Sequence, residues 1–249
     1  MMQFLNLILI NLVALMALSY FWSFYTHKLF KPFAWLDARK KNEHSKVILK
    51  TERGFKDKMR FYALWLQLKR IEKNKVDGAI AELGVYKGET AKVIHHMLPD
   101  RSFYLFDSFS GLPKQVIKED CDGTVRPQTV QFDNTSPDEV LNYINGDANK
   151  LHIKEGVFPE TTEDIDESTF ALVHVDADLY QSTMDALEYF YPKLSEAGAI
   201  IIHDYNHNWD GVKKAVDEFE KRIPEAFIEL PDMYGSVVLI KNTKQAWNE

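Results

Sequence analysis

Residues 170–205 read FALVHVDADLYQSTMDALEYFYPKLSEAGAIIIHDY, and this stretch decides the fold. Its two apolar runs, residues 170–175 and 199–202, lack the alternation of a half-exposed strand and therefore predict strands buried on both faces. Between them, residues 183–194 carry apolar side chains at helical spacing. A strand, a helix and a strand in this order predict a right-handed βαβ unit of a parallel sheet.

The same alternation of short apolar runs and amphipathic stretches fills most of the chain. Near its end, the turn sequence PDMYG (residues 231–235) joins two apolar runs and predicts an antiparallel pair of strands. We therefore predict an α/β fold of the Rossmann-like methyltransferase type, with a mainly parallel seven-stranded sheet and an antiparallel C-terminal strand. The further strands are predicted at residues 79–83, 103–106, 151–154, 226–230 and 236–240, and the further helices at residues 55–75, 89–97, 136–144 and 212–222.

The N-terminus has a different character, because residues 1–25 contain no charged side chain. At about 1.5 Å per residue, a helix over residues 4–25 spans a bilayer core of roughly 30 Å. Aromatic residues crowd its C-terminal end, as they do at membrane interfaces. We predict a retained transmembrane helix within residues 1–26. The alternatives are a cleaved signal peptide, although the segment lacks the basic start of such a peptide, and a buried or monotopic helix.

Charge is divided along the chain. Residues 26–75 hold 15 Lys and Arg against 5 Asp and Glu, whereas the whole chain has a net charge of -7. A basic stretch directly after a membrane helix predicts that the rest of the chain is cytoplasmic, and that the stretch contacts anionic headgroups rather than nucleic acid. The single cysteine excludes an intramolecular disulfide, which agrees with the cytoplasm.

These observations predict three parts: a membrane anchor (residues 1–26), a basic connector (27–54) and a catalytic domain (55–249). Within the domain, residues 114–135 are long for a loop and predict a lid over the substrate or an insertion. The expected partners are a small-molecule or lipid-linked saccharide and, through the anchor, a membrane. A homo-oligomer is left open, and no nucleic acid is expected.

Ligands of an open parallel sheet bind beyond the carboxyl ends of its strands. After the first predicted strand, Gly84 and Gly88 allow a tight turn and a close backbone approach before a helix begins. Asp107 ends the second strand, where a carboxylate accepts hydrogen bonds from ribose hydroxyls. These residues predict a nucleoside-bearing cofactor. They leave NAD and S-adenosylmethionine open, although the G-x-G-x-x-G spacing of a dinucleotide site is absent.

Polar residues also follow the fourth and fifth strands of the predicted sheet. Asp176 and Asp178 come after one, and His203 and Asp204 after the other. Carboxylates at this density repel each other unless a cation binds or a proton is shared. Oxygen ligands with one imidazole suit Mg²⁺ or Mn²⁺. The alternative is that Asp178 and Asp204 cap the helices that come next in the chain.

Several segments together resemble the macrocin O-methyltransferase family. They are GVYKGETAKVI (84–94), FYLFDSFSGLP (103–113), GVFPET (156–161), the stretch that ends at residue 205, and WDGVKKAVDEF (209–219). The likeness covers roughly residues 55–240 and omits the N-terminal helix. It implies a metal-dependent methyltransferase that acts on sugar hydroxyls of natural products. It also implies S-adenosylmethionine binding at Glu82, Gly84, Tyr86, Gly88, Thr90, Asp107 and Ser108.

For the metal, the resemblance implies ligation by Asp176, His203 and Asp204. The family usually has two aspartates at the last pair, so His203 is a departure that favours Mn²⁺ over Mg²⁺ or leaves His203 as a base. The catalytic set is then Asp176, Asp178 and His203, with Asp178 as the nearest general base for a hydroxyl bound to the metal. Two other functions stay open: a non-catalytic, membrane-anchored S-adenosylmethionine-binding module, and a catechol-type O-methyltransferase. An NAD-dependent sugar oxidoreductase is disfavoured by the missing fingerprint.

Overall fold

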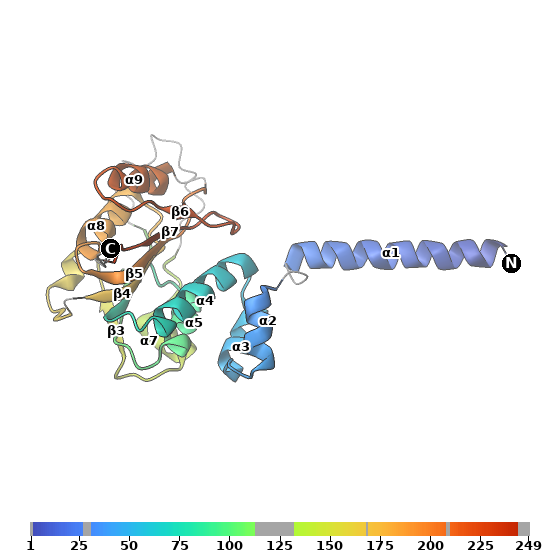
Figure 1. The fold of residues 1–249 in the computed structure, drawn as a ribbon, viewed down its shortest axis with the longest axis horizontal. Helices are drawn as coiled ribbons and strands as arrows, with labels where there is room; N and C mark the ends of the chain where they lie inside the picture. Colours follow the sequence, from blue (N-terminus) through green and yellow to red (C-terminus); the bar gives the residue numbers. More distant parts are fainter. Residues whose placement is uncertain (1, 27–30, 113–131, 168, 208–209, 244–249) are drawn as a thin grey trace, which may run out of the picture.

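The computed structural model describes residues 2–26, 31–112, 132–167, 169–207 and 210–243 (Figure 1). Its centre is a seven-stranded sheet with the strand order β3-β2-β1-β4-β5-β7-β6. The first five strands pair in parallel, whereas β7 pairs antiparallel with both β5 and β6. The predicted fold is thereby confirmed. The strands are β1 (Ala79–Leu83), β2 (Phe103–Asp107), β3 (Leu151–Glu155), β4 (Phe170–Val175), β5 (Leu194–Ile202), β6 (Ile228–Glu229) and β7 (Val237–Ile240).

Helices cover both faces of the sheet, as the continuous apolar strands require (Figure 1). Every residue of β1 and β4 is buried, and the two faces carry separate apolar clusters. One cluster lies under helices α4, α5 and α7, and the other under α8 and α9. These helices are α4 (Lys58–Lys73), α5 (Glu89–Met97), α7 (Pro137–Ile144), α8 (Tyr180–Phe190) and α9 (Asp210–Glu220).

Several predicted boundaries differ from the observed ones, most clearly at the junction of α8 and β5. The helix expected over residues 183–194 ends at Phe190, and Leu194 already belongs to β5. Phe170 pairs with Leu194, whereas Leu172 pairs with Ala199, so β5 bulges between its two paired ends. Leu194 continues the apolar spacing of the helix, but Pro192 lacks a backbone N–H and disfavours a helical residue before it, and the helix ends ahead of this proline.

Residues 27–54 differ from the predicted connector. They contain α2 (Phe33–Lys40) and α3 (Lys46–Gly54), which join the core under α4. Trp35 of α2 is fully buried, with its ring 5.1 Å from that of Trp65 and 5.3 Å from that of Phe61. The basic side chains lie on the outer faces of these short helices. A charge count averaged over the segment therefore hides the apolar side chains that face inward, such as those of Ala38 and Ile48.

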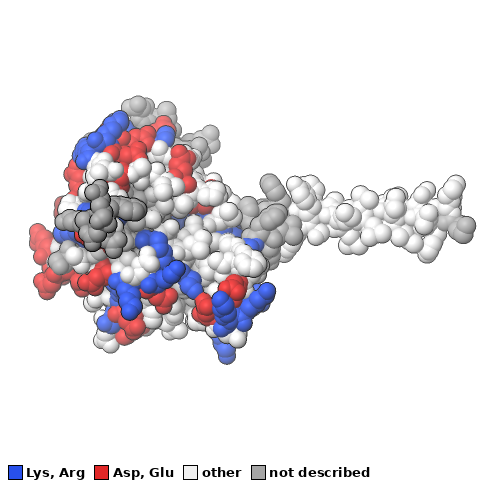
Figure 2. Space-filling model, viewed as in Figure 1, with Lys and Arg blue, Asp and Glu red and all other residues white. Residues whose placement is uncertain are grey.

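Helix α1 (Met2–Thr26) projects from the domain in Figure 1. Its segment Met2–Ser23 has a mean hydropathy of 2.1, and it is the one helix in the described ranges that is long and apolar enough to cross a membrane. Figure 2 shows no charged side chain on it, whereas both signs of charge cover the domain. A signal sequence meets the same criteria, so the retained anchor stays a prediction.

Candidate active site

The glycine loop after β1 lies directly against the end of β4. Gly84 has a φ of 83°, and a Cβ at this position would lie 2.0 Å from the backbone oxygen of Asp176. The amide of Asp176 donates to the carbonyl of Leu83 at 2.8 Å. Glycine is therefore required here for a close approach of two backbones. The consequence is that the position of Asp176 depends on Gly84.

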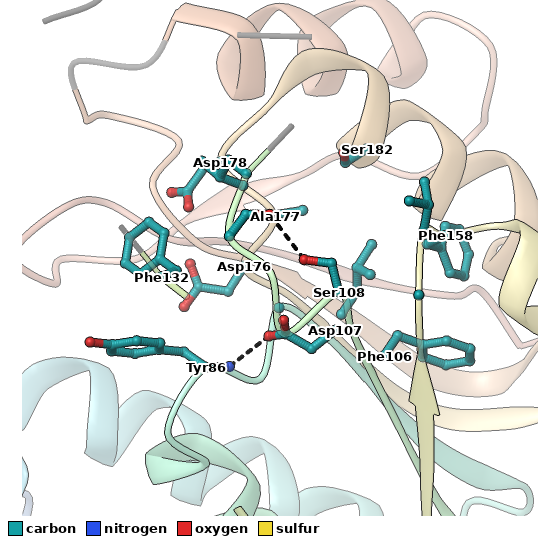
Figure 3. A pocket seen from close by; sticks show the side chains of 16 residues that line it. Tyr86, Phe106, Asp107, Ser108, Phe132, Phe158, Asp176, Ala177, Asp178 and Ser182 are labelled. Atoms are coloured by element: carbon teal, nitrogen blue, oxygen red, sulfur yellow. Dashed lines mark hydrogen bonds between the residues drawn. The ribbon is translucent and has the colours of Figure 1, made fainter. Parts of the chain in front are cut away.

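Asp107 at the end of β2 fixes the same loop. Its Oδ2 accepts hydrogen bonds from the amides of Val85 (2.9 Å) and Tyr86 (2.8 Å), and its Oδ1 accepts from the amide of Phe109 (2.8 Å). Figure 3 shows the bond to Tyr86. The carboxylate thus holds the turns after β1 and β2 together, and Oδ1 keeps one lone pair for a ligand.

Beyond the carboxyl ends of β1, β2 and β4 lies a pocket with two chemically different ends (Figure 3). The rings of Phe106 and Phe158 form an apolar end, 5.3 Å apart at 88°. At the other end lie the carboxylates of Asp176 and Asp178, next to Tyr86. Further lining residues are Leu83, Gly84, Asp107, Ser108, Gly111, Leu112, Phe132, Gly156, Val157, Ala177 and Ser182.

The predicted cofactor residues divide into two groups. Gly84, Tyr86, Asp107 and Ser108 line the pocket, whereas Glu82, Gly88 and Thr90 are not among the lining residues. Gly88, with a φ of 76°, is the N-cap of α5, and a Cβ there would lie 3.1 Å from the Val140 side chain of α7. Thr90 is buried in the first turn of α5. Both residues therefore contribute to the packing of the helix that follows the loop.

Glu82 is buried below the pocket and pairs with His174 of β4. Its Oε1 lies 3.1 Å from His174 Nδ1. Burial, followed by the charge of Asp176, raises the pKa of Glu82 well above its ordinary value. Burial and the charge of Arg60 lower the pKa of His174 to about 3. At neutral pH the two groups are therefore a neutral pair that fills the sheet interior, not an ion pair.

Asp176, His203 and Asp204 converge as the sequence predicts, with one ligand atom of each within 4.8 Å of the others. His203 Nδ1 lies 2.7 Å from Asp204 Oδ1 and 3.3 Å from Asp176 Oδ1. Despite these distances, neither ring nitrogen of His203 nor Asp204 Oδ1 has a partner at hydrogen-bonding angles. Buried donors and acceptors without such partners are costly. Two carboxylates and an imidazole aimed at a common point fit a divalent cation.

The charges of the cluster are strongly coupled. Burial alone would lower the pKa of His203, but the charge of Asp176 and the close approach of the Asp176 and Asp204 carboxylates raise it to about 9. Burial opposes ionisation of Asp176, yet His203 and Arg60 hold the pKa of this carboxyl well below its ordinary value. Burial, followed by the charges of Asp176 and Asp204, raises the pKa of Asp178 well above its ordinary value. The pKa of Asp176 is therefore lowered and that of Asp178 is raised, although the two residues are only two positions apart.

Asp178 does not cap the helix that comes after it. The N-cap of α8 is Leu179, and no side chain bonds to the free amides of that helix end. Asp204 lies six residues before Asp210, the first residue of α9. Asp178 and Asp204 both have a positive φ, 59° and 62°. For Asp178, the structure therefore removes the capping role that was the alternative to a catalytic one.

Sequence reasoning missed Arg60, which belongs to the first turn of α4. Its Nη2 donates to Asp176 Oδ2 at 2.6 Å and lies 3.5 Å from His174 Nε2. Asp57, the N-cap of α4, accepts from the amide of Arg60 at 3.1 Å and so fixes the helix start. The two partners are 116 residues apart in the chain, and no local pattern marks the pair. The pocket residues Phe106 and Phe158 were also missed, although both lie in segments that carried the family resemblance.

Comparison with known proteins agrees with this geometry. A family model described as macrocin-O-methyltransferase (TylF) matches residues 50–234. Among solved structures, the O-methyltransferase NovP superposes with a TM-score of 0.62 at 24% identity, covering 75% of this chain and 81% of that one. A calicheamicin methyltransferase superposes with a TM-score of 0.57 at 20% identity, covering 91% and 90%. These structures share the fold.

Three curated relatives were found by sequence. Demethyldecarbamoylnovobiocin O-methyltransferase of Streptomyces niveus is 32% identical over 161 residues, 60% of each chain. A relative from Streptomyces olivaceus, named for 4'-O-methylation of a dimethoxyrhamnosyl tetracenomycin, is 27% identical over 159 residues, 59% of each chain. Mycinamicin III 3''-O-methyltransferase of Micromonospora griseorubida is 27% identical over 171 residues, 62% of this chain and 66% of that one. The matches therefore span about 60% of the first two relatives.

Proposed function

We propose that this chain, which belongs to the macrocin O-methyltransferase family, transfers a methyl group from S-adenosylmethionine to a hydroxyl of a sugar. The observation that carries the proposal is the position of Asp176, which lines the pocket and also belongs to the three-residue cluster. A cofactor pocket and a site for activating a hydroxyl thus share one residue. The names of the curated relatives, one of which contains a rhamnosyl group, support a sugar as the acceptor.

The two ends of the pocket suit the two ends of the cofactor. Phe106 and Phe158 pack against each other and make this end of the pocket apolar, which suits the burial of an adenine ring. The free lone pair of Asp107 can accept a ribose hydroxyl. At the acidic end, Asp176 and Asp178 favour the positive sulfonium and direct its methyl group toward the cluster.

Asp176, His203 and Asp204 would hold Mg²⁺ or Mn²⁺, because their unpartnered buried atoms match the donor set of such a cation. When bound, the cation would withdraw charge from the acceptor hydroxyl and so favour the loss of its proton. Asp178 would take that proton. Burial and the neighbouring carboxylates raise the pKa of Asp178, and the charge of a bound cation would lower it again and leave the carboxylate able to accept the proton.

Helix α1 would anchor the enzyme in a membrane, with the domain on the cytoplasmic side, where the basic residues after the helix belong. An enzyme held at a bilayer has ready access to an acceptor that is itself in the bilayer. We therefore extend the proposal to a lipid-linked saccharide. The prediction of a lid over residues 114–135 falls mainly on residues outside the described ranges and stays a prediction.

A direct test uses the full-length protein with S-adenosylmethionine and a membrane glycolipid extract. We expect S-adenosylhomocysteine to form and glycolipids to gain the mass of one methylene group. Excess EDTA should abolish both, and added Mn²⁺ or Mg²⁺ should restore them. Cofactor binding measured by calorimetry without any turnover on the extract would instead indicate a non-catalytic module. Turnover that is unaffected by EDTA would remove the cation from the proposal.

A further inference from the structure

The loop between β6 and β7 is held rigidly at the edge of the cluster. The amide of Met233 donates to Asp57 Oδ2 at 2.7 Å, and the amide of Asn206 donates to the carbonyl of Tyr234 at 3.1 Å. A Cβ on Gly235, which has a φ of 70°, would lie 2.6 Å from the Asn206 side chain. The loop is thus fixed by α4 on one side and by the segment after β5 on the other.

This rigid loop nevertheless exposes large apolar side chains. Met233 is 48% exposed and Tyr234 is 38% exposed. Met59, whose amide bonds to the same Asp57 carboxylate, is 38% exposed on the first turn of α4. We call Met59, Met233 and Tyr234 the apolar shelf. Exposed apolar side chains on an ordered loop are typical of a binding surface. The hydrogen bonds of the loop already fix its backbone, so a ligand that binds there does not have to order it.

The shelf adjoins the three-residue cluster. The ring of Tyr234 stands edge to face with two imidazoles, 6.0 Å from His203 and 4.6 Å from His207. Next to Met59, Arg60 donates to Asp176. No shelf residue lines the pocket that Gly84 and Asp107 form. The cluster therefore lies between the cofactor pocket and the shelf.

Methyl transfer from a sulfonium is an in-line displacement, so the acceptor oxygen must approach the methyl carbon from the side opposite the sulfur. In the proposed function the sulfonium lies at the acidic end of the pocket, and the cluster and the shelf lie beyond that end. From this arrangement, and resting on the proposed function, we propose that the shelf binds a lipid-linked saccharide. A sugar ring stacks on Tyr234, and the apolar chain next to the sugar lies over Met59 and Met233. Aromatic rings accept the apolar faces of sugars, and methionines adapt to flexible chains.

The position of the N-terminal helix favours a lipid chain as the occupant. Six residues separate Thr26, the end of α1, from Phe33, the start of α2, and seven steps of about 3.6 Å limit the distance to roughly 25 Å. Phe33 is 81% exposed. In Figure 1, the β6–β7 loop and the start of α4 lie on the side of the domain from which α1 departs. The shelf therefore opens toward the surface at which a lipid-linked acceptor would be presented.

The test uses full-length protein in nanodiscs and saturation-transfer NMR with hexyl glycosides of glucose, galactose and rhamnose, each compared with its methyl glycoside. We expect at least one hexyl glycoside to bind at least tenfold more tightly than its methyl counterpart. Tyr234→Ala should weaken binding about tenfold, and Tyr234→Phe should restore it, because the ring face is kept. Met233→Ser should remove most of the advantage of the hexyl chain. Ile228→Ser is the matched control, since Ile228 is 59% exposed on the same hairpin and outside the shelf.

Calorimetry with S-adenosylmethionine on the same samples separates this inference from the proposed function. If the cofactor binds and the Tyr234→Ala and Met233→Ser variants bind glycosides like the wild type, the shelf is not the acceptor site. Equal loss in Ile228→Ser, or no binding of any hexyl glycoside by the wild type, also overturns it. If methyl and hexyl glycosides bind equally but depend on Tyr234, the sugar subsite stands and the lipid chain is refuted. Failure to bind the cofactor refutes the proposed function itself.

Discussion

Replacing Gly84 with alanine tests whether the glycine loop sets the position of Asp176. The added Cβ would lie 2.0 Å from the Asp176 carbonyl oxygen, whereas contacts under 3.0 Å are essentially never seen for real Cβ atoms. The two backbones must therefore separate by about 1 Å. A positive φ at a non-glycine residue costs roughly a further 1 kcal/mol. We expect a loss of about 2–4 kcal/mol in the free energy of unfolding, in the range of overpacked cores.

Activity should fall more than stability. A shift of about 1 Å in a positioning residue can cost roughly 100-fold in rate. The assay is S-adenosylhomocysteine formation by folded Gly84→Ala protein, with urea unfolding measured in parallel. Gly54→Ala is the control, because a Cβ at Gly54 meets nothing within 4 Å, and it should leave both quantities nearly unchanged. If Gly84→Ala keeps wild-type turnover and unfolding free energy, the dependence of Asp176 on Gly84 is refuted.

The remaining predictions concern the cluster, the core and the anchor. Arg60→Gln leaves Asp176 without its guanidinium partner, and we expect it to lower the free energy of unfolding in urea by about 3 kcal/mol. Arg60→Lys should lie between this variant and the wild type. Equal stability of the wild type and both variants would contradict the pairing. Trp35→Ala empties a fully buried site and should cost roughly 3–5 kcal/mol, whereas a loose connector over residues 27–54 would tolerate it. Deleting residues 2–26 should release the protein from membranes in a flotation assay while its thermal unfolding temperature stays the same, because residues 2–22 are exposed; a destabilised soluble form would show that the helix belongs to the core.

Much of the fold was predictable because parallel strands must be apolar on both faces and must be followed by helices. The N-cap of α7 shows how local the signal can be: Ser136 precedes Pro137, and its hydroxyl accepts from the amide of Glu139 at 3.4 Å, as its sequence predicts. The cluster followed from the same rule, because neighbouring strand ends bring Asp176 and Asp204 together whatever the details of packing.

The parts that could not be predicted depend on contacts distant in sequence. Arg60 reaches Asp176 only after α4 packs on the sheet, and Glu82 turns out to face His174 in the interior. Composition averaged over a segment also conceals its buried residues. Helices α2 and α3 are basic outside but bury Trp35, Ala38 and Ile48, so composition alone indicated a connector. Asp107 lines the pocket at the end of β2, where the sequence predicts it, but its hydrogen bonds to loop amides follow from backbone geometry that residue types do not encode.

Asp176 connects the three parts of the proposed enzyme. Its backbone rests on Gly84 of the cofactor loop, its Oδ1 faces His203, and its Oδ2 accepts from Arg60. Arg60 in turn lies in the first turn of α4, whose N-cap, Asp57, also holds the shelf loop through the amide of Met233. Asp176 is thus held by contacts with Gly84, His203 and Arg60. A displacement of the shelf, transmitted through Asp57 and Arg60, therefore alters the cluster and the pocket together. This chain of contacts is the physical reason to expect that acceptor binding at the shelf and cofactor binding in the pocket are coupled.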